Sequence, residues 1–427
     1  MSENHRVFIT GYSALTASGA NAEETWSSVL QGKQGIDEIK EWDISSWPCR
    51  LGGELKAFQP AKLLPDRKLM KVISRQDVMG INAAMQAVEH SQLLPYRDGL
   101  DLSEEFNNRT GVYVGSPGNK YFQQYDFLSL VSKTGDNMQA FAEKLFEEVH
   151  PMWLLRILPN NVLAYTGITY GFKGPNHNIT NHAVGGLQAV LEAYHAIQQG
   201  LISRAVVIAY DMATEPQALF YYDKLGVISY RHLKPFDEQH DGTILAEGAA
   251  AMVLESEASA KARSASCFAE IITGSTSTEA DGLFSVEEGG VHLAQSINQM
   301  LESHQLDVES FGMVVAHGNG NVKSDETEAK ALTQVFGQYS VPVTAFKWSM
   351  GHTVCASGLV DGVLATKSLE TGTIPGIANF EKAADSCKVL NLSREHRELD
   401  KSKPYSLLVN RGFGSINASL IIKRCDD

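Results

Sequence analysis

The sequence predicts an α/β fold, because short apolar strands alternate with longer segments of helical period along most of the chain. The predicted strands are rich in apolar or β-branched residues and end near glycine or polar residues; they lie at 7–11, 112–115, 205–210, 250–254, 313–316 and 405–410. Two helices rich in glycine and alanine, at 185–197 and 356–365, each follow a strand and a turn. Their similarity indicates that one half of the chain repeats the architecture of the other.

Composition indicates a soluble protein with a large core. The chain has 427 residues, of which 43% are hydrophobic, and it contains no low-complexity linker. No apolar run is long enough to span a membrane, and the N-terminus does not have the pattern of a signal peptide. Five cysteines without CxxC spacing argue against a zinc site or a disulfide framework, so we expect a cytoplasmic protein. A formal net charge of -14 argues against nucleic acid and anionic membranes as partners.

The segment 174–187 reads GPNHNITNHAVGGL. It resembles the β-ketoacyl synthase motif G-P-N-x-x-I-T-T-A-C-x-x-G, in which a strand leads into a buried helix with the catalytic cysteine at the turn. Ala183 occupies the position of that cysteine, and His182 replaces the small residue before it. Because a methyl group cannot form an acyl thioester, we expect no condensation activity from this chain alone.

Further motifs extend the resemblance along nearly the whole chain. They read RVFITG at 6–11, ETW at 24–26, GKQGI at 32–36, RTGVYVGS at 109–116, PFD at 235–237, DG at 241–242 and EGA at 247–249. The resemblance implies a thiolase-like fold, a duplicated α-β-α-β-α five-layer sandwich. It also implies an N-terminal ketosynthase-like half at 1–260, which includes the nucleophile turn, and a C-terminal half at 261–427.

Two histidine motifs match the family's remaining active-site positions. The segment 316–328 resembles H-G-T-x-T-x-x-G-D-x-x-E, and 347–358 resembles K-S-x-x-G-H-x-x-G-A-x-G. The resemblance places His317 and His352 where family members stabilise the enolate of a malonyl thioester, and it places Lys347 and Glu328, with Asp325, around them. We expect none of these residues to be catalytic here.

No metal and no resident cofactor is expected, since phosphopantetheine arrives on an acyl carrier protein. Cys355 stands where the family motif has glycine. We expect it to be a packed small hydrophobic residue rather than a relocated nucleophile.

The segment 410–420 resembles the family's N-S-F-G-F-G-G-T-N-x-x-L. Phe413 matches the second phenylalanine, whereas Arg411 falls on the first, which gates the acyl pocket in active synthases. An arginine at that position must be paired or solvated, because an unpaired buried charge is very costly. We therefore expect a remodelled pocket entrance formed by Arg411, Phe413 and His182.

The chain lacks the catalytic cysteine and has a changed pocket entrance, but it keeps the other family motifs. In this combination it resembles chain-length factors, the inactive partners of type II polyketide ketosynthases. The runs AVGGLQAV at 183–190 and PVTAFK at 342–347 resemble their Q-A-G-G-L-D-A-L and P-V-T-A-x-K. The resemblance implies a heterodimer with an active ketosynthase, served by an acyl carrier protein, in which this subunit shapes the tunnel for a growing polyketide or polyene chain. The candidate tunnel and interface residues are Phe122, Tyr125, Leu128, Met138 and Phe141, for which ordinary core packing is the alternative.

Two other functions are compatible with the sequence. With both histidines and no thiol, the chain could decarboxylate malonyl-carrier protein to an acetyl starter unit. Alternatively, Ala183 could be an engineered replacement of cysteine in an active condensing enzyme. Arg411 and His182 argue against the second alternative, because such a change would leave the surrounding residues ordinary.

Overall fold

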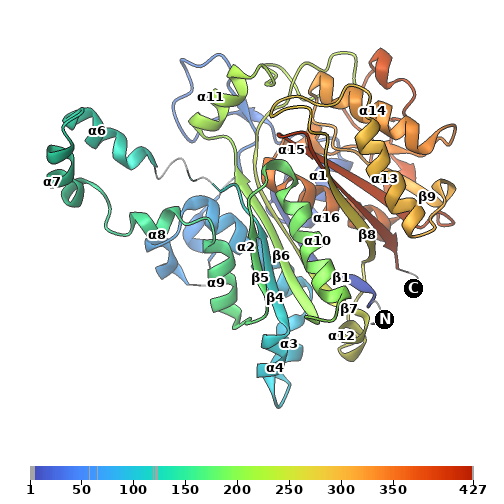
Figure 1. The fold of residues 1–427 in the computed structure, drawn as a ribbon, viewed down its shortest axis with the longest axis horizontal. Helices are drawn as coiled ribbons and strands as arrows, with labels where there is room; N and C mark the ends of the chain where they lie inside the picture. Colours follow the sequence, from blue (N-terminus) through green and yellow to red (C-terminus); the bar gives the residue numbers. More distant parts are fainter. Residues whose placement is uncertain (1–4, 57, 65, 119, 121–123, 426–427) are drawn as a thin grey trace.

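The computed structural model describes residues 5–56, 58–64, 66–118, 120 and 124–425. Its core is a run of ten hydrogen-bonded strands in the order β10-β9-β13-β14-β8-β1-β7-β6-β4-β5 (Figure 1). The strands are β1 (Val7–Thr16), β4 (Thr110–Gly115), β5 (Asn176–Ile179), β6 (Arg204–Met212), β7 (Glu247–Ser256), β8 (Ala269–Thr278), β9 (Phe311–Val315), β10 (Val343–Thr344), β13 (Tyr405–Gly412) and β14 (Ile416–Arg424). All six predicted strands are present.

The strand order repeats one pattern twice. In one half, β5, β4 and β6 are parallel, and β7 and β1 follow as antiparallel strands. In the other half, β10, β9 and β13 are parallel, and β14 and β8 follow as antiparallel strands. The halves join where Val7, Phe8 and Ile9 of β1 pair with β8. This duplication confirms the predicted fold, while the boundary at 260/261 stays a prediction.

The helices complete a layered sandwich. They are α1 (Ala22–Leu30), α2 (Arg75–His90), α3 (Leu93–Asp98), α4 (Ser103–Asn108), α6 (Leu128–Thr134), α7 (Met138–Glu148), α8 (Trp153–Ile157), α9 (Asn161–Tyr170), α10 (Gly185–Gln198), α11 (Pro216–Lys224), α12 (Glu257–Ala262), α13 (Val291–Ser303), α14 (Val322–Phe336), α15 (Lys347–Met350) and α16 (Ser357–Thr371). Helix α2 packs on β1, β6 and β7, and α10 packs on β4 and β6. Helix α16 lies between α10 and β13, and α13 packs on β8 beside α14.

Alternating side chains show that α2 and α10 cover opposite faces of β6. Val206 and Ile208 belong to the core beneath α2, whereas Ala205 and Val207 belong to the core that contains α10. Successive side chains of a strand point to opposite faces, so the sheet is buried on both sides. Helices α10 and α16 therefore form a central layer between the two halves, as the thiolase-like fold requires.

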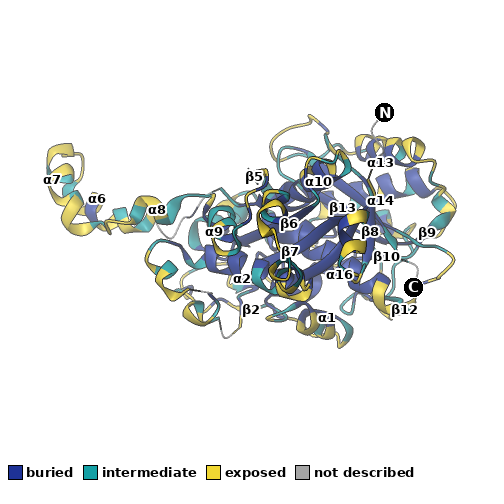
Figure 2. Ribbon diagram, turned by 90° about the horizontal axis from the view of Figure 1, so that it is seen from below, coloured by how far each residue is buried: buried dark blue, intermediate teal, exposed yellow. Residues whose placement is uncertain are grey.

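Three helices, α6, α7 and α8, form an arm that projects from the body (Figures 1 and 2). The arm has a small core of its own, in which the ring of Phe127 contacts Trp153 at 4.4 Å and Phe141 at 6.3 Å between centroids, and Leu130 is fully buried. Elsewhere on the arm, large apolar side chains face outward. Among the helices of the described chain, none combines the length and the apolar character needed to cross a membrane.

Candidate functional site

The turn predicted to carry the nucleophile joins β5 to α10 through a single 3-10 turn, His182–Val184. Ala183 is fully buried at its centre. His182 has a φ of 45°, a left-handed conformation that is rare for a residue other than glycine. The sequence therefore builds the sharp turn that presents a nucleophile, with alanine at its centre.

A second turn of the same shape lies in the other half of the duplicated fold. The 3-10 turn Val354–Ala356 precedes α16, and Val354 has a φ of 38°. Cys355 thus occupies in this turn the place that Ala183 occupies in the first. Its N–H donates to Asp211 Oδ2 at 3.1 Å, its side chain is fully buried, and burial raises the pKa of the thiol well above its usual value. A thiol held neutral by burial is a poor nucleophile.

The two turns are packed tightly against each other. A Cβ on Gly185 would lie 3.1 Å from Cys355 Sγ, and a Cβ on Gly186 would lie 2.8 Å from Cys355 O. Glycine is therefore required at the start of α10. The Cys355 sulfur is therefore packed against the start of α10 and does not face a cavity.

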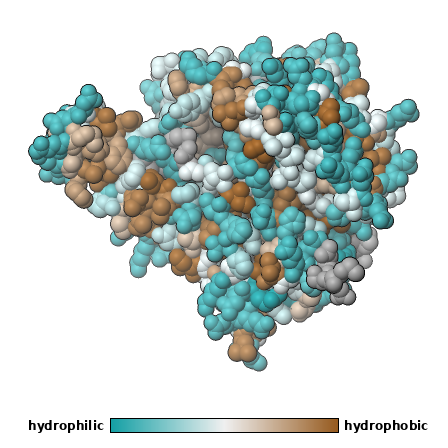
Figure 3. Space-filling model, in the orientation of Figure 1, coloured by the Kyte–Doolittle hydropathy of each residue, from teal (hydrophilic) through white to brown (hydrophobic). Residues whose placement is uncertain are grey.

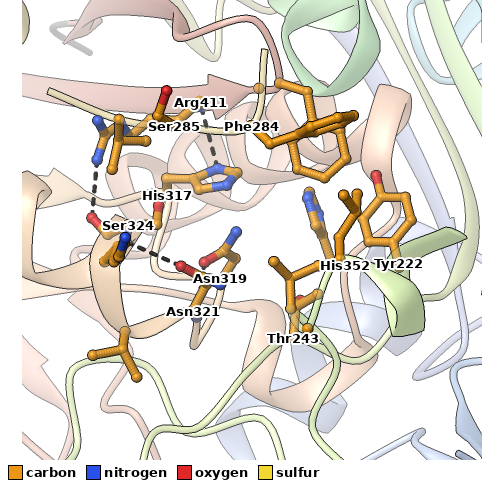
Figure 4. Close-up of a pocket in the computed structure, with 18 of the residues that line it drawn as sticks. Tyr222, Thr243, Phe284, Ser285, His317, Asn319, Asn321, Ser324, His352 and Arg411 are labelled. Atoms are coloured by element: carbon orange, nitrogen blue, oxygen red, sulfur yellow. Dashed lines mark hydrogen bonds between the residues drawn. The ribbon is translucent and has the colours of Figure 1, made fainter. Parts of the chain in front are cut away.

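Beside the turn lies a cavity of about 330 Å³ (Figure 4). Its lining includes His182, Tyr222, Phe284, His317, Asn319, Asn321, His352, Arg411 and Phe413. The structure thus brings together residues from both halves of the chain that the sequence motifs singled out separately. In Figure 4 the rings of His317 and His352 face the same space, with centroids 5.2 Å apart.

Both histidines are neutral at physiological pH. Burial, assisted by the positive charge of Lys347, lowers the pKa of His317 and of His352 well below the usual value. His317 Nδ1 accepts the backbone N–H of Arg411 at 3.3 Å, so the proton of the neutral ring is on Nε2, and this atom can donate a hydrogen bond. His352 Nδ1 is buried and has no hydrogen-bond partner among the described residues.

The acidic residues predicted around the histidines hold the backbone. Glu328 accepts the N–H groups of His317 and Gly318 at 2.7 and 3.0 Å, and burial raises the pKa of its carboxyl to about 7. Asp325 Oδ2 accepts the N–H of Phe236 at 2.8 Å. These contacts fix the loop that carries His317.

Lys347 has a partner that the sequence motifs did not indicate. Its Nζ lies 2.5 Å from Asp361 Oδ2, and both side chains are buried. Asp361 belongs to α16, a helix of the central layer. The lysine is thus fixed by an ion pair to that layer.

Arg411 is buried and paired, which is one of the two states that the sequence allowed for it. Its guanidinium lies 2.8 Å from Glu279 Oε1, with 4% and 1% of the two side chains exposed. It also donates to Asn417 Oδ1 at 3.1 Å, to Ser324 O at 2.9 Å and to Thr327 Oγ1 at 2.6 Å. A side chain with this many partners cannot swing as an aromatic gate does.

His182 lies in an aromatic cluster at the wall of the cavity. Its ring stacks on Phe413 with centroids 4.3 Å apart, and its Nε2 lies 2.6 Å from the Tyr222 hydroxyl. Burial lowers the pKa of His182 to about 4. Sequence reasoning missed Tyr222, Glu279 and Asp361, because nothing in the chain near them marks the contacts that folding creates.

The arm contains most of the predicted tunnel and interface residues. Leu128 and Met138 are 60% and 70% exposed, so they are not core residues of this protomer. Phe141 packs on Phe127, and Tyr125 donates its hydroxyl to Glu215 Oε2 at 2.7 Å, which ties the base of the arm to α11. Phe122 lies outside the described residues.

No group of three or more His, Cys, Asp or Glu side chains in the described parts of the chain is placed to hold a metal ion. The histidine pair adds neutral rings and a hydrogen-bond donor to the cavity wall. Chemically, this arrangement can bind a carbonyl group and stabilise negative charge on its oxygen. Neither turn supplies a nucleophile for a covalent intermediate, since one carries Ala183 and the other the packed Cys355.

Comparisons with known proteins agree with the motifs. Residues 4–260 match the family described as Beta-ketoacyl synthase, N-terminal domain, and residues 268–381 match Beta-ketoacyl synthase, C-terminal domain. The 3-oxoacyl-[acyl-carrier-protein] synthase 2 of Vibrio cholerae is 28% identical over 431 residues, covering 98% of this chain and 99% of the relative. The protein of the same name from Coxiella burnetii is 27% identical over 437 residues and 100% of both chains.

Solved structures share the fold. "The ishigamide ketosynthase/chain length factor" superposes with a TM-score of 0.88 at 22% identity, covering 99% of this chain and 100% of that one. A β-ketoacyl synthase from Burkholderia phymatum gives a TM-score of 0.86 at 24% identity, with the same coverage. The ketosynthase complex AntDE:AntF, solved with its type II acyl-carrier protein, gives 0.82 at 20% identity, again with the same coverage.

Proposed function

Because this chain belongs to the β-ketoacyl synthase family, we propose that it is a catalytically inactive subunit of the chain-length-factor type, which pairs with an active ketosynthase. One observation carries the proposal. Ala183, which cannot form a thioester, sits at the centre of an intact nucleophile turn. The body around it keeps the fold, so the chain can still build the shared interface and tunnel of a dimer.

The exposed arm supports pairing with a second subunit. Beyond Leu128 and Met138, Phe146 is 89% and Leu154 is 62% exposed, and Figure 3 shows hydrophobic surface gathered along the arm. Exposed apolar side chains in such number are typical of a protein interface. The chain that grows between the subunits arrives on the phosphopantetheine of an acyl carrier protein, in the cytoplasm.

Co-expression with a type II ketosynthase that has an intact catalytic cysteine tests the pairing. We expect a one-to-one complex by size-exclusion chromatography with light scattering, and no acyl adduct on this chain by intact mass after incubation with acyl-carrier protein. A stable homodimer that ignores the ketosynthase would contradict the proposal. An acyl adduct on this chain would also contradict it.

Product length tests the tunnel role. Leu128→Trp and Phe141→Trp add volume to the arm, and we expect the complex to release shorter products at a similar rate if either side chain lines the tunnel. Leu102→Trp is a matched control, because Leu102 is 77% exposed beside α4, away from the arm. Unchanged product length across a scan of 124–145 would remove the tunnel role.

A second function is favoured by the histidine pair. His317 and His352 are neutral, close together and face one cavity, and this arrangement can stabilise the enolate formed when malonyl-carrier protein loses carbon dioxide. The purified subunit would then release acetyl-carrier protein, and the release would depend on both rings. Release that matches the background rate would exclude this second function.

A further inference from the structure

Two cavities meet at the wall that contains His182. One is the histidine-lined cavity described above, and the other, of about 470 Å³, is lined by residues that include Asp211, Met212, Ala218 and Val354. The described residues common to both are His182, Tyr222, Leu225, Phe284 and Phe413. The side chains of this shared wall therefore separate the cavity that contains the histidine pair from the second cavity.

Within the wall, His182 uses a backbone donor that lies beside the turn. Its Nδ1 accepts the N–H of Phe413 at 3.1 Å. A Cβ on Gly412 would lie 3.2 Å from His182 Nδ1 and 3.4 Å from Ala183 N. Among the described residues, no backbone carbonyl accepts a hydrogen bond from the Ala183 N–H. The N–H groups of Ala183 and Phe413 thus border one small space, and the imidazole of His182 fills it.

A thiol at position 183 would need that space for chemistry. Acyl transfer places a negative oxygen beside the nucleophile, where backbone N–H groups, including one at the nucleophile turn, stabilise it. We infer that His182 blocks this site, with the lone pair of Nδ1 standing where the carbonyl oxygen of a thioester would accept the Phe413 N–H. The chain would then be inactive for two independent reasons, the missing thiol and the occupied donor.

Three contacts hold the His182 ring in this position. Since Nδ1 accepts a hydrogen bond, Nε2 carries the proton and donates to the Tyr222 oxygen 2.6 Å away. The ring also stacks on Phe413 with an interplanar angle of 20°. The left-handed backbone of His182 is unfavourable for a residue with a Cβ, so the contacts must offset that strain to keep the ring in place.

The inference rests on the assignment of Ala183 to the nucleophile position, and it is tested by restoring the thiol. We compare Ala183→Cys alone, Ala183→Cys with His182→Ala, and Ala183→Cys with His182→Asn. Asparagine is the matched control, because its side-chain oxygen can accept the Phe413 N–H where Nδ1 does. Each variant is given octanoyl-coenzyme A, whose C–S bond breaks as a new C–S bond to the introduced thiol forms, and the thiol proton passes to the sulfur of coenzyme A.

Intact mass against time measures the acylation rate, and iodoacetamide measures thiol access by a displacement that forms no oxyanion. We expect acylation of the alanine double variant to be about a hundredfold faster than that of the other two, the usual effect of one oxyanion donor. Alkylation should differ far less among the three variants. Equal acylation of Ala183→Cys and the alanine double variant would overturn the inference, whether both are fast or both are slow, and so would fast acylation of the asparagine variant.

Circular dichroism of each variant verifies folding. If the alanine double variant does not fold, Ala183→Cys with His182→Gly replaces it, because glycine adopts the left-handed conformation of residue 182 without strain. Fast acylation of Ala183→Cys alone would leave the proposed pairing with a ketosynthase untouched. The blocking role of His182 can therefore be refuted while the proposed pairing with a ketosynthase still stands.

Discussion

Replacing Arg411 by methionine should destabilise the protein by about 4 kcal/mol, the middle of the range for breaking one side of a buried ion pair. The magnitude follows from burial, since 4% of the Arg411 side chain and 1% of the Glu279 side chain are exposed. The change leaves the buried Glu279 carboxylate without its cation. It also removes the donors to Ser324 O and Thr327 Oγ1.

Urea unfolding followed by tryptophan fluorescence measures the loss, with the slope of the transition checked for constancy. The double variant Arg411→Met with Glu279→Gln should recover about 2 kcal/mol, because no unpaired charge remains buried. Lys382→Met is the control, since Lys382 and Glu238 form an ion pair whose side chains are 64% and 43% exposed, and it should barely move the midpoint. A loss below about 1 kcal/mol in Arg411→Met, or strictly additive effects in the double variant, would refute this reasoning.

Three further predictions concern the arm, the histidines and Glu328. Phe146→Asp should weaken binding to a ketosynthase by about a hundredfold or more in titration calorimetry. The Phe146 side chain is 89% exposed, and an aromatic side chain buries roughly 150–250 Å² when it packs in an interface. Leu102→Asp should leave the affinity unchanged. His317→Ala and His352→Ala should alter thermal stability more than turnover by the complex, whereas a loss of about a hundredfold in acetyl-carrier protein release would favour decarboxylation. The pKa of Glu328 is raised to about 7, so the stability that its protonated carboxyl contributes is present below about pH 4.5 and is lost as the pH rises to about 7. Over that range the free energy of unfolding of Glu328→Gln should rise by up to about 3 kcal/mol relative to that of the wild type. A difference between the two proteins that does not change with pH would contradict the burial of a neutral carboxyl.

Sequence motifs alone determined the family, the missing nucleophile and the two histidines. Each of these is carried by residues adjacent in the chain, such as GPNHNITNHA before Val184, because a turn between a strand and a helix is a local structure. The period of the strands and of the two glycine-rich helices likewise predicted an α/β architecture, since burial of both sheet faces leaves a pattern in the order of side chains. The duplication was visible for the same reason.

Only the tertiary structure decided how the unusual residues are accommodated. Arg411 forms an ion pair with Glu279, and Lys347 forms one with Asp361. His182 hydrogen-bonds to the Phe413 N–H and to the Tyr222 hydroxyl. All but one of these partners lie far away in the chain. Packing brings them together, and no sequence pattern marks a contact between distant segments. The arm illustrates the same limit. Its apolar residues fit either an interface or a core in the sequence, and only the arrangement of the helices leaves Leu128, Met138 and Phe146 exposed.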